Sequence, residues 1–309
     1  MAVSSGPLPL GAALAAGPVV LDGGLSTELE SRGHDVTSAL WSARLLGEAP
    51  QAVADAHAAF AAAGAQVATT ASYQATLPGF AAAGIDAAAA AVLIHRSVRL
   101  ARDGMAAAGR DGWVAGSVGP YGAFLADGSE YRGDYVAGTS VDELRAFHRP
   151  RLELLAEAGV DVLACETLPA AAEVEALLAE VDRLGLPAWL SLTAVTGSDG
   201  VPRTRRGEPL ADVLATTRDV PAVIAVGVNC TDPAGVVTAV EVAAAASGKP
   251  VVAYPNSGEV WDAATRRWTG APGVGDVTGW LAAGARLVGG CCRVRPADVR
   301  AISDAVAGR

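Results

Sequence analysis

Three cysteines lie where their types and spacing favour a metal site. Cys230 ends an apolar run at residues 222–230, and Cys291 and Cys292 end a second run at residues 285–292. Both runs are short, apolar and flanked by Pro or Gly, as buried strands are. One thiolate from one strand end and two from another would give Zn²⁺ three ligands and leave its fourth tetrahedral position open, as in catalytic sites. Such a metal could bind and activate another thiol.

Ordinary buried thiols are the alternative interpretation, since free cysteine is common in protein cores. Side chains alternate along a strand, so Cys291 and Cys292 can face one site only where the strand has ended or bulged, and Gly289 and Gly290 would permit that bend. A disulfide between neighbouring cysteines is strained, which favours reduced thiols and a cytoplasmic protein. Cys165 has no evident partner and is interpreted as a core thiol.

The composition predicts a folded protein that acts on small molecules. The chain has 309 residues, of which 51% are hydrophobic, enough for a large core. A formal net charge of -10 argues against nucleic acid as a partner. Residues 1–21 carry no charged side chain, but Pro7, Pro9 and Pro18 interrupt them and they lack a basic start. We therefore expect neither a signal peptide nor a membrane span there.

Eight strand candidates alternate with helical segments along the chain. The helices include 141–158 and 170–184. The strand candidates are residues 19–24, 67–72, 113–119, 162–167, 188–193, 222–230, 251–257 and 285–292. Such alternation implies a parallel sheet, and eight units predict an α/β fold of one domain, a (β/α)8 TIM barrel over residues 1–309. Chemistry in such barrels lies at the carboxyl ends of the strands, where the sixth and eighth strands would bring the three cysteines together.

Two carboxylates stand at predicted strand ends. Asp22 is followed by Gly23 and Gly24, which could form a left-handed turn or let a ligand approach the backbone closely; we favour the second interpretation. Glu166 closes the fourth strand and could hold the ammonium group of an amino acid. Thr167 is predicted as the N-cap of the following helix, with a proline just inside it.

Aromatic and basic side chains near the rim are weaker candidates. As a group the aromatics could line a pocket for an onium methyl donor, because aromatic faces attract cations; they are Trp41, Tyr73, Tyr121 and Trp261. Three arginines after the fifth strand form a solvated cluster or bind a substrate carboxylate; they are Arg203, Arg205 and Arg206. The histidines lack ligand spacing and are interpreted as surface or packing residues; they are His34, His57, His95 and His148. No nucleophile elbow, phosphate loop or dinucleotide fingerprint is present.

Seven strings, in order along the chain, resemble the homocysteine S-methyltransferases. They are LDGGLSTELE (21–30), TTASYQAT (69–76), GSVGPYG (116–122), ACET (164–167), GVNC (227–230), YPNSG (254–258) and GGCC (289–292). The segment LADGSEYRGDY (125–135) looks most like the branch that uses S-methylmethionine. The chain carries neither the further domains of cobalamin-dependent relatives nor the long C-terminal extension of betaine-using ones, which favours a sulfonium donor.

The resemblance implies a zinc-binding barrel that methylates L-homocysteine to methionine. It implies Cys230, Cys291 and Cys292 as zinc ligands, and Glu166 with the Asp22–Gly23 turn as the anchor of the amino acid. Asn256 is our candidate, after water, for the fourth ligand when homocysteine is absent. The substrate-binding residues predicted in this way are Asp22, Gly23, Gly24, Ser72, Tyr73, Glu166, Asn229 and Asn256.

Several alternatives remain open from the sequence. The donor is expected to be S-methylmethionine or S-adenosylmethionine, with betaine as an alternative donor and selenocysteine as an alternative acceptor. A non-enzymatic barrel that senses thiols or metals would also use three cysteines. The expected partners are small molecules only, and the protein is expected to be a monomer or a small homo-oligomer.

Overall fold

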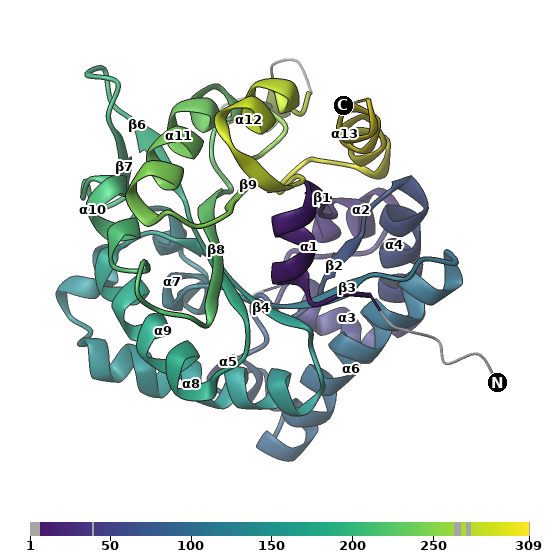
Figure 1. The fold of residues 1–309 in the computed structure, drawn as a ribbon. Coiled ribbons are helices and arrows are strands. Elements are labelled where there is room, and N and C mark those ends of the chain that lie inside the picture. Colours follow the sequence, from purple (N-terminus) through teal and green to yellow (C-terminus); the bar gives the residue numbers. More distant parts are fainter. Residues whose placement is uncertain (1–6, 39, 263–266, 270–272, 309) are drawn as a thin grey trace.

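An eight-stranded parallel sheet forms the centre of the molecule. The computed structural model describes residues 7–38, 40–262, 267–269 and 273–308. The strands follow the order β1-β12-β9-β8-β5-β4-β3-β2. A parallel bridge from Leu21 to Val67 joins the two outer strands of this order and closes the ring. Helices surround the ring (Figure 1), so the predicted (β/α)8 barrel is confirmed.

The barrel strands lie at the eight predicted places. They are β1 (Val19–Val20), β2 (Val67–Thr69), β3 (Trp113–Val118), β4 (Val162–Leu168), β5 (Ala188–Leu192), β8 (Val223–Asn229), β9 (Val251–Tyr254) and β12 (Ala285–Val288). Several end before the predicted residue, because the rim backbone pairs with other loops. The amide of Asn256 donates to Thr231 and that of Cys291 donates to Pro255. The polar rim residues therefore lie on turns rather than in strands.

One barrel helix follows each strand and is bounded by local signals. These helices are α4 (Pro50–Ala63), α6 (Ala87–Ala107), α8 (Val141–Glu157), α9 (Ala171–Leu184), α10 (Leu210–Ala215), α11 (Val236–Ser247), α12 (Val277–Ala283) and α13 (Pro296–Ala307). Ser140 and Glu143 form a capping box at the start of α8, and Asp86 caps α6. Gly185 and Gly248 end α9 and α11 in the left-handed conformation.

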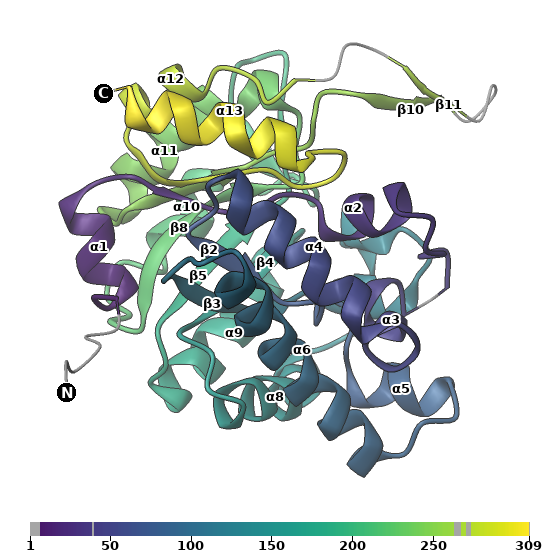
Figure 2. The ribbon, with the colours of Figure 1, turned by 90° about the vertical axis from the view of Figure 1, so that its right-hand side faces the viewer.

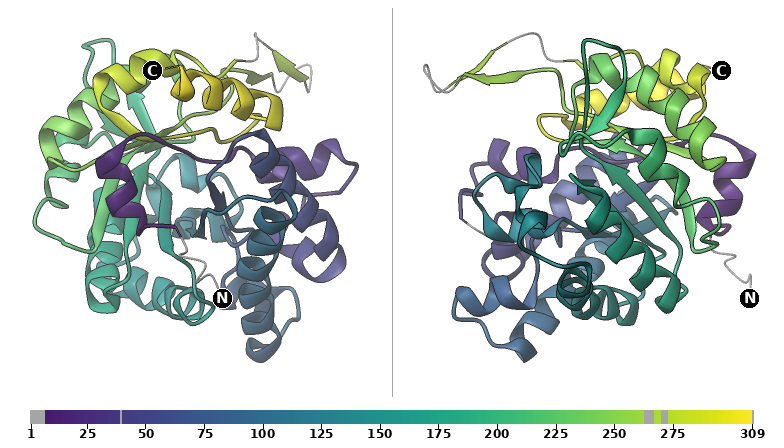
Figure 3. Two further views of the ribbon diagram at one scale, coloured as in Figure 1. Left: turned by 45° about the vertical axis from the view of Figure 1, so that its right-hand side comes forward. Right: turned by 90° about the vertical axis from the view of Figure 1, so that its left-hand side faces the viewer.

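Short elements follow the carboxyl ends of the strands and build the rim. They are α2 (Leu25–Ser31), α3 (Ser42–Glu48), α5 (Leu77–Ala82), α7 (Tyr121–Leu125), the 3₁₀ turns η1 (Ser129–Tyr131), η2 (Asp134–Ala137) and η3 (Pro233–Gly235), and the hairpins β6 (Ala194–Thr196) with β7 (Pro202–Thr204) and β10 (Val260–Asp262) with β11 (Arg267–Thr269). Figures 2 and 3 show the β10–β11 hairpin projecting from the end opposite to the amino terminus.

The predicted helix cap at Thr167 was wrong. Thr167 belongs to β4, and α9 begins at Ala171 with Ala170 before it. A residue that precedes proline avoids the helical region, so the strand continues through Leu168. The Thr167 hydroxyl instead accepts a hydrogen bond from the Asn229 side chain, 2.7 Å away.

The amino-terminal helix α1 (Leu10–Ala16) closes one end of the barrel (Figure 1). Its side chains Leu10 and Leu14 pack with the barrel interior, which includes Trp113 and Trp189. The Trp113 indole also donates to the carbonyl of Leu8, 2.8 Å away. The opposite end, at the carboxyl ends of the strands, is left for the rim loops.

Within the described part of the chain, no helix combines the length and apolar character that a bilayer crossing requires.

Removing the apolar contact of α1 should destabilise the barrel. Leu14 is 1% exposed, so Leu14→Ala should lower the free energy of unfolding by about 2–5 kcal/mol, through lost burial and the cavity left behind. Leu8 is 66% exposed, and Leu8→Ala should change it by less than about 0.5 kcal/mol. Urea unfolding of both variants checks this, and equal effects would mean that α1 does not contribute through packing.

Candidate active site and metal centre

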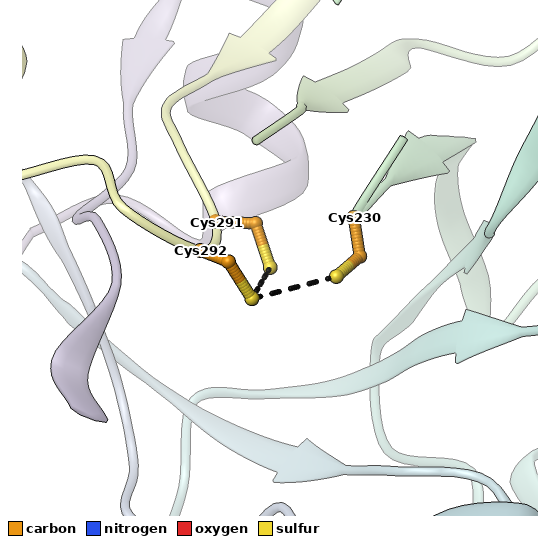
Figure 4. A group of neighbouring side chains, drawn as sticks. All are labelled: Cys230, Cys291 and Cys292. Carbon is orange, nitrogen blue, oxygen red and sulfur yellow. Dashed lines mark hydrogen bonds between the residues drawn. The ribbon is translucent and has the colours of Figure 1, made fainter. Parts of the chain in front are cut away.

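The three cysteines lie just after two barrel strands that flank β9. Cys230 follows the end of β8, and Cys291 and Cys292 follow the end of β12. Cys230 has a φ of 48°, a left-handed conformation that is costly for a non-glycine residue and turns the chain at the rim. The Cys292 amide donates to the side-chain oxygen of Asn256, 3.2 Å away. Since both strands have ended, the neighbouring cysteines can face the same point (Figure 4).

The sulfur positions suit a thiolate-bound metal ion. The Cys230 and Cys292 sulfur atoms are 3.7 Å apart and those of Cys291 and Cys292 are 4.0 Å apart. All three sulfur atoms lie within 4.8 Å of one another. Ligands at about 2.3 Å from a tetrahedral zinc ion are separated by about 3.8 Å. The spacing therefore fits this coordination without rearrangement of the backbone.

The protonation of the three thiols also favours a cation between them. Hydrogen bonds from the Cys230 and Cys291 thiols hold the pKa of Cys292 well below its usual range. The same interactions with Cys230 and Cys292 raise the pKa of Cys291 well above its usual range. One thiolate thus forms readily and opposes the ionisation of its neighbours. A dication would remove this opposition, because metal binding requires and stabilises the deprotonated thiol.

Tyr131, which the sequence interpretation did not single out, completes the surroundings of the sulfur atoms. Its hydroxyl lies 3.1 Å from the Cys230 sulfur. The residue ends η1, within the 125–135 segment that served only to indicate the donor branch. The Arg205 guanidinium lies 5.8 Å from the centre of the Tyr131 ring and covers it. Only the tertiary fold brings this loop to the cysteines.

A cavity of about 790 Å³, including its open mouth, lies beside the sulfur atoms. Eight of the predicted site residues line it: Asp22, Gly23, Gly24, Tyr73, Glu166, Cys230, Cys291 and Cys292. Further polar lining residues that the sequence interpretation missed are Thr69, Gln74, Ser117, Tyr131 and Tyr254.

The two predicted carboxylates are buried in the wall of this cavity. Asp22 accepts hydrogen bonds from the Thr69 amide at 2.6 Å and from the Thr69 hydroxyl at 2.8 Å. Glu166 accepts a hydrogen bond from the Ser117 hydroxyl. Burial nevertheless raises the pKa of each carboxyl group to about 7. A cation entering the cavity would meet two carboxyl groups that its own charge helps to ionise.

Three predicted substrate residues are not among those that line the cavity, and their side chains form hydrogen bonds within the protein. Asn229 is buried, and its side-chain oxygen accepts from the Thr167 amide at 2.7 Å and from the Ser191 hydroxyl at 2.8 Å. The Ser72 hydroxyl donates to the Ser117 carbonyl, 2.7 Å away. Asn256 supports Cys292 through the hydrogen bond described above. In each case the polar side chain forms a hydrogen bond with a backbone group of a neighbouring segment.

The glycines after β1 allow close protein packing rather than a left-handed turn. A side chain at Gly24 would place its first carbon 2.6 Å from the Cys291 carbonyl oxygen. At Gly23 that carbon would lie 2.7 Å from the Val294 carbonyl oxygen. Neither residue has a positive φ. The absence of these side chains lets the turn that carries Cys291 approach β1, so the glycines position the cysteines while also lining the cavity.

Comparison with known proteins decides the family. The model of the homocysteine S-methyltransferase family matches residues 19–306. The homocysteine S-methyltransferase of Escherichia coli is 46% identical over 298 residues, which cover 92% of this chain and 94% of that protein. The homocysteine S-methyltransferase YbgG of Bacillus subtilis is 41% identical over 304 residues, covering 92% and 93%. The chain belongs to the homocysteine S-methyltransferase family.

A solved structure agrees with this assignment. The crystal structure of the homocysteine methyltransferase MmuM from Escherichia coli in its metallated form superimposes with a TM-score of 0.84. The two chains are 44% identical, and the match covers 96% of this chain and 99% of the other. The expected family and the expected methyltransferase class are therefore confirmed for this chain.

Two of the four aromatic candidates lie at the cavity. The rings of Trp41 and Tyr73 stack with centroids 6.1 Å apart, and both residues line the cavity. Tyr121 packs in a separate aromatic cluster with Phe147, 4.8 Å between ring centroids. The side chain of Trp261 lies outside what the structure describes. Of the aromatic residues singled out from the sequence, the stacked pair is therefore the one that a cation in the cavity could contact.

The arginine, histidine and remaining cysteine candidates are paired with or buried by other parts of the protein. Arg203 forms an ion pair with Asp199, 2.9 Å apart, and Arg205 donates to the Thr193 hydroxyl. His148 is buried against Glu173, 2.8 Å away, so it contributes to packing as expected. Cys165 is buried in the core, also as expected.

Glu166 should make stability depend on pH. Its pKa is about 7 in the folded protein against 4.5 for the free group, so the folded state holds the proton more tightly. The resulting stabilisation is complete below pH 4.5 and is lost as the pH rises to about 7. Glu166→Gln has no carboxyl group to titrate at this position. As the pH rises across that window, the free energy of unfolding of the variant should therefore rise relative to that of the wild type by on the order of 3 kcal/mol.

Urea unfolding of both metal-free proteins between about pH 5 and 8 measures this difference. Asp22 is present in both proteins, so its own titration cancels to first order. A difference that does not change with pH would show that the buried carboxyl group is ionised as easily as in water.

Proposed function

We propose that this protein catalyses zinc-dependent transfer of a methyl group from S-methylmethionine, or from S-adenosylmethionine, to the thiol of L-homocysteine, which yields methionine. One domain carries the activity, and the substrates are small molecules. The observation that carries the proposal is the group of three cysteine sulfur atoms on the wall of a cavity with two buried carboxyl groups. Thiolate ligands suit zinc, and three protein ligands leave one position for a substrate thiol.

The chemistry is a displacement at a methyl carbon. When bound, zinc would lower the pKa of the homocysteine thiol so that it reacts as a thiolate near neutral pH. The sulfur of homocysteine forms the new bond to the methyl carbon while the bond from that carbon to the sulfonium sulfur breaks. The electron pair of the broken bond remains on the donor sulfur, which leaves as a neutral thioether. The reaction therefore requires no general base at the methyl group.

The chain's own residues hold and align the reactants. Cys230, Cys291 and Cys292 would bind the metal, and Glu166 with Asp22 would bind the ammonium group of homocysteine. A buried carboxylate paired with that ammonium forms a charge-assisted hydrogen bond and fixes the direction of the amino acid. The stacked rings of Trp41 and Tyr73 offer their faces to an onium group. Correct alignment of sulfur, methyl carbon and leaving group supplies much of the rate enhancement.

The donor is tested by methionine formation. Zinc-loaded, reduced protein would receive L-homocysteine with S-methylmethionine, S-adenosylmethionine or betaine in parallel, and selenocysteine would replace homocysteine in a fourth reaction. We expect the largest kcat/KM with S-methylmethionine. Turnover with betaine alone would contradict the sulfonium donor and retain the thiol chemistry. Absence of turnover with every donor, despite bound zinc, would contradict the proposed reaction.

Cys291→Ala should remove zinc and activity together. Two thiolates bind zinc far more weakly than three, so the metal content after dialysis should fall from about one equivalent towards zero. Metal analysis and methionine formation on the same sample measure both quantities. Cys165→Ala is the matched control, since this buried thiol lies outside the cavity, and it should keep the metal. A Cys291→Ala protein with full activity and no metal would contradict the mechanism.

A further inference from the structure

The Tyr131 hydroxyl contacts one of the three sulfur atoms, and the proposed chemistry does not use it. It lies 3.1 Å from the Cys230 sulfur. Tyr131 is partly exposed and lines the cavity that the substrates would enter. It comes from the loop between β3 and α8, whereas the cysteines follow β8 and β12. A polar group from one part of the rim therefore reaches a metal ligand from another.

The chemistry of the two atoms determines which of them donates. With both groups protonated, either the hydroxyl or the thiol could be the donor. A cysteine that binds a metal ion is a thiolate, which has lone pairs but no proton. A phenol keeps its proton near neutral pH. In the metal-bound protein the Tyr131 hydroxyl is therefore the donor, and the Cys230 sulfur is the acceptor.

Arg205 supports both sides of this contact. Its guanidinium lies over the Tyr131 ring, 5.8 Å from the ring centre. Its Nε donates to the Thr193 hydroxyl at 3.1 Å, and that hydroxyl donates to the Cys230 carbonyl at 3.2 Å. Thr193 is fully buried. One arginine thus contacts the phenol ring directly and holds the Cys230 backbone through a single residue, so the two partners of the contact are fixed relative to each other.

The turn that carries Tyr131 is packed closely against the start of α7. The first carbon of a side chain at Gly122 would lie 2.5 Å from the Glu130 backbone nitrogen and 2.7 Å from the Ser129 carbonyl carbon. The Ser129 backbone nitrogen donates to the Asp127 side chain, 2.9 Å away. This packing holds the turn in place without a ligand, so the contact with Cys230 is preformed.

The charge of the loaded metal centre gives the hydrogen bond a purpose. Three cysteine thiolates carry more negative charge than a zinc dication can offset. In the proposed reaction the homocysteine thiolate adds a further negative charge at the open position. A hydrogen bond to a thiolate disperses part of this charge, and such outer partners of metal ligands tune both affinity and reactivity. Loss of the donor should therefore weaken binding of the metal ion and of the substrate thiolate.

We propose that Tyr131 is a positioning residue whose hydroxyl donates a hydrogen bond to the Cys230 thiolate, which strengthens zinc binding and stabilises the homocysteine thiolate on the metal. This inference rests on the proposed function and specifies a residue that tunes its metal centre. The hydroxyl acts through a metal ligand, so its effect falls on the thiol that the metal binds. The KM for homocysteine should depend on it, and the KM for the methyl donor should not.

Zinc affinity is the first measurement. Tyr131→Phe removes the hydroxyl and keeps the ring under Arg205. Competition with a chromophoric chelator should give a zinc dissociation constant about 10- to 100-fold above that of the wild type. Tyr121→Phe is the matched control, because this ring packs against Phe147 and is not among the residues that line the cavity; its dissociation constant should change less than about two-fold. An unchanged dissociation constant in Tyr131→Phe would overturn the inference.

Cobalt distinguishes a hydrogen bond to sulfur from a general loosening of the loop. Co²⁺ can replace zinc in thiolate sites, and its complexes absorb light as electrons move from sulfur to metal. With homocysteine bound, the wild type and Tyr131→Phe present the same sulfur ligands. The sulfur-to-cobalt band should lie at longer wavelength in Tyr131→Phe, because a sulfur without the hydrogen bond gives up electrons more easily. A band at the wild-type wavelength would show that Tyr131 only supports the loop.

Kinetics with zinc in excess give an independent test. In Tyr131→Phe the KM for homocysteine should rise about three-fold or more, while kcat and the KM for S-methylmethionine should change less than about two-fold. A donor KM that rises as much as the homocysteine KM, or rises alone, would overturn the inference and leave the proposed reaction standing. Wild-type protein that binds no zinc would overturn the proposed function, and the inference with it.

Discussion

Mutual repulsion among three close thiolates is the constraint on which the site depends. With sulfur atoms 3.7 and 4.0 Å apart, ionisation of one thiol opposes ionisation of the others. The barrel nevertheless holds them together. Cys230 adopts a left-handed backbone conformation, and the lack of side chains at Gly23 and Gly24 lets the turn that carries Cys291 approach β1. A protein has little reason to maintain this arrangement unless a cation offsets the repulsion.

The barrel solves the positioning problem by placing the thiols on strand ends. β8 and β12 are fixed in register by β9 between them, so the two ends cannot shift independently. The turn that follows β12 is hydrogen-bonded to the turn that follows β9: the Cys291 amide donates to the Pro255 carbonyl, and the Cys292 amide donates to the Asn256 side chain. Stability at the far end comes from α1, whose apolar side chains fill the interior. The two ends thus carry separate tasks, as in other barrels of this kind.

The alternation of strands and helices was enough to predict the barrel, because each strand needed only an apolar run and a break after it. The meeting of the cysteines followed from strand order alone. The roles of single rim residues did not follow. Asn229 has the same polar character whether it contacts a substrate or the Thr167 amide, and only the fold distinguishes the two. Tyr131 and Gln74 lie on loops whose paths depend on contacts distant in sequence, so no local pattern marks them.

The two buried carboxyl groups give the cavity a fixed anchor beside the cysteines. Asp22 and Glu166 receive protein donors and are held in place before any ligand arrives. Burial raises the pKa of each carboxyl group to about 7, so ionisation of either group is costly until a cation lies beside it. A ligand that brings its own positive charge removes that cost on binding, which favours a substrate with an ammonium group over a neutral one.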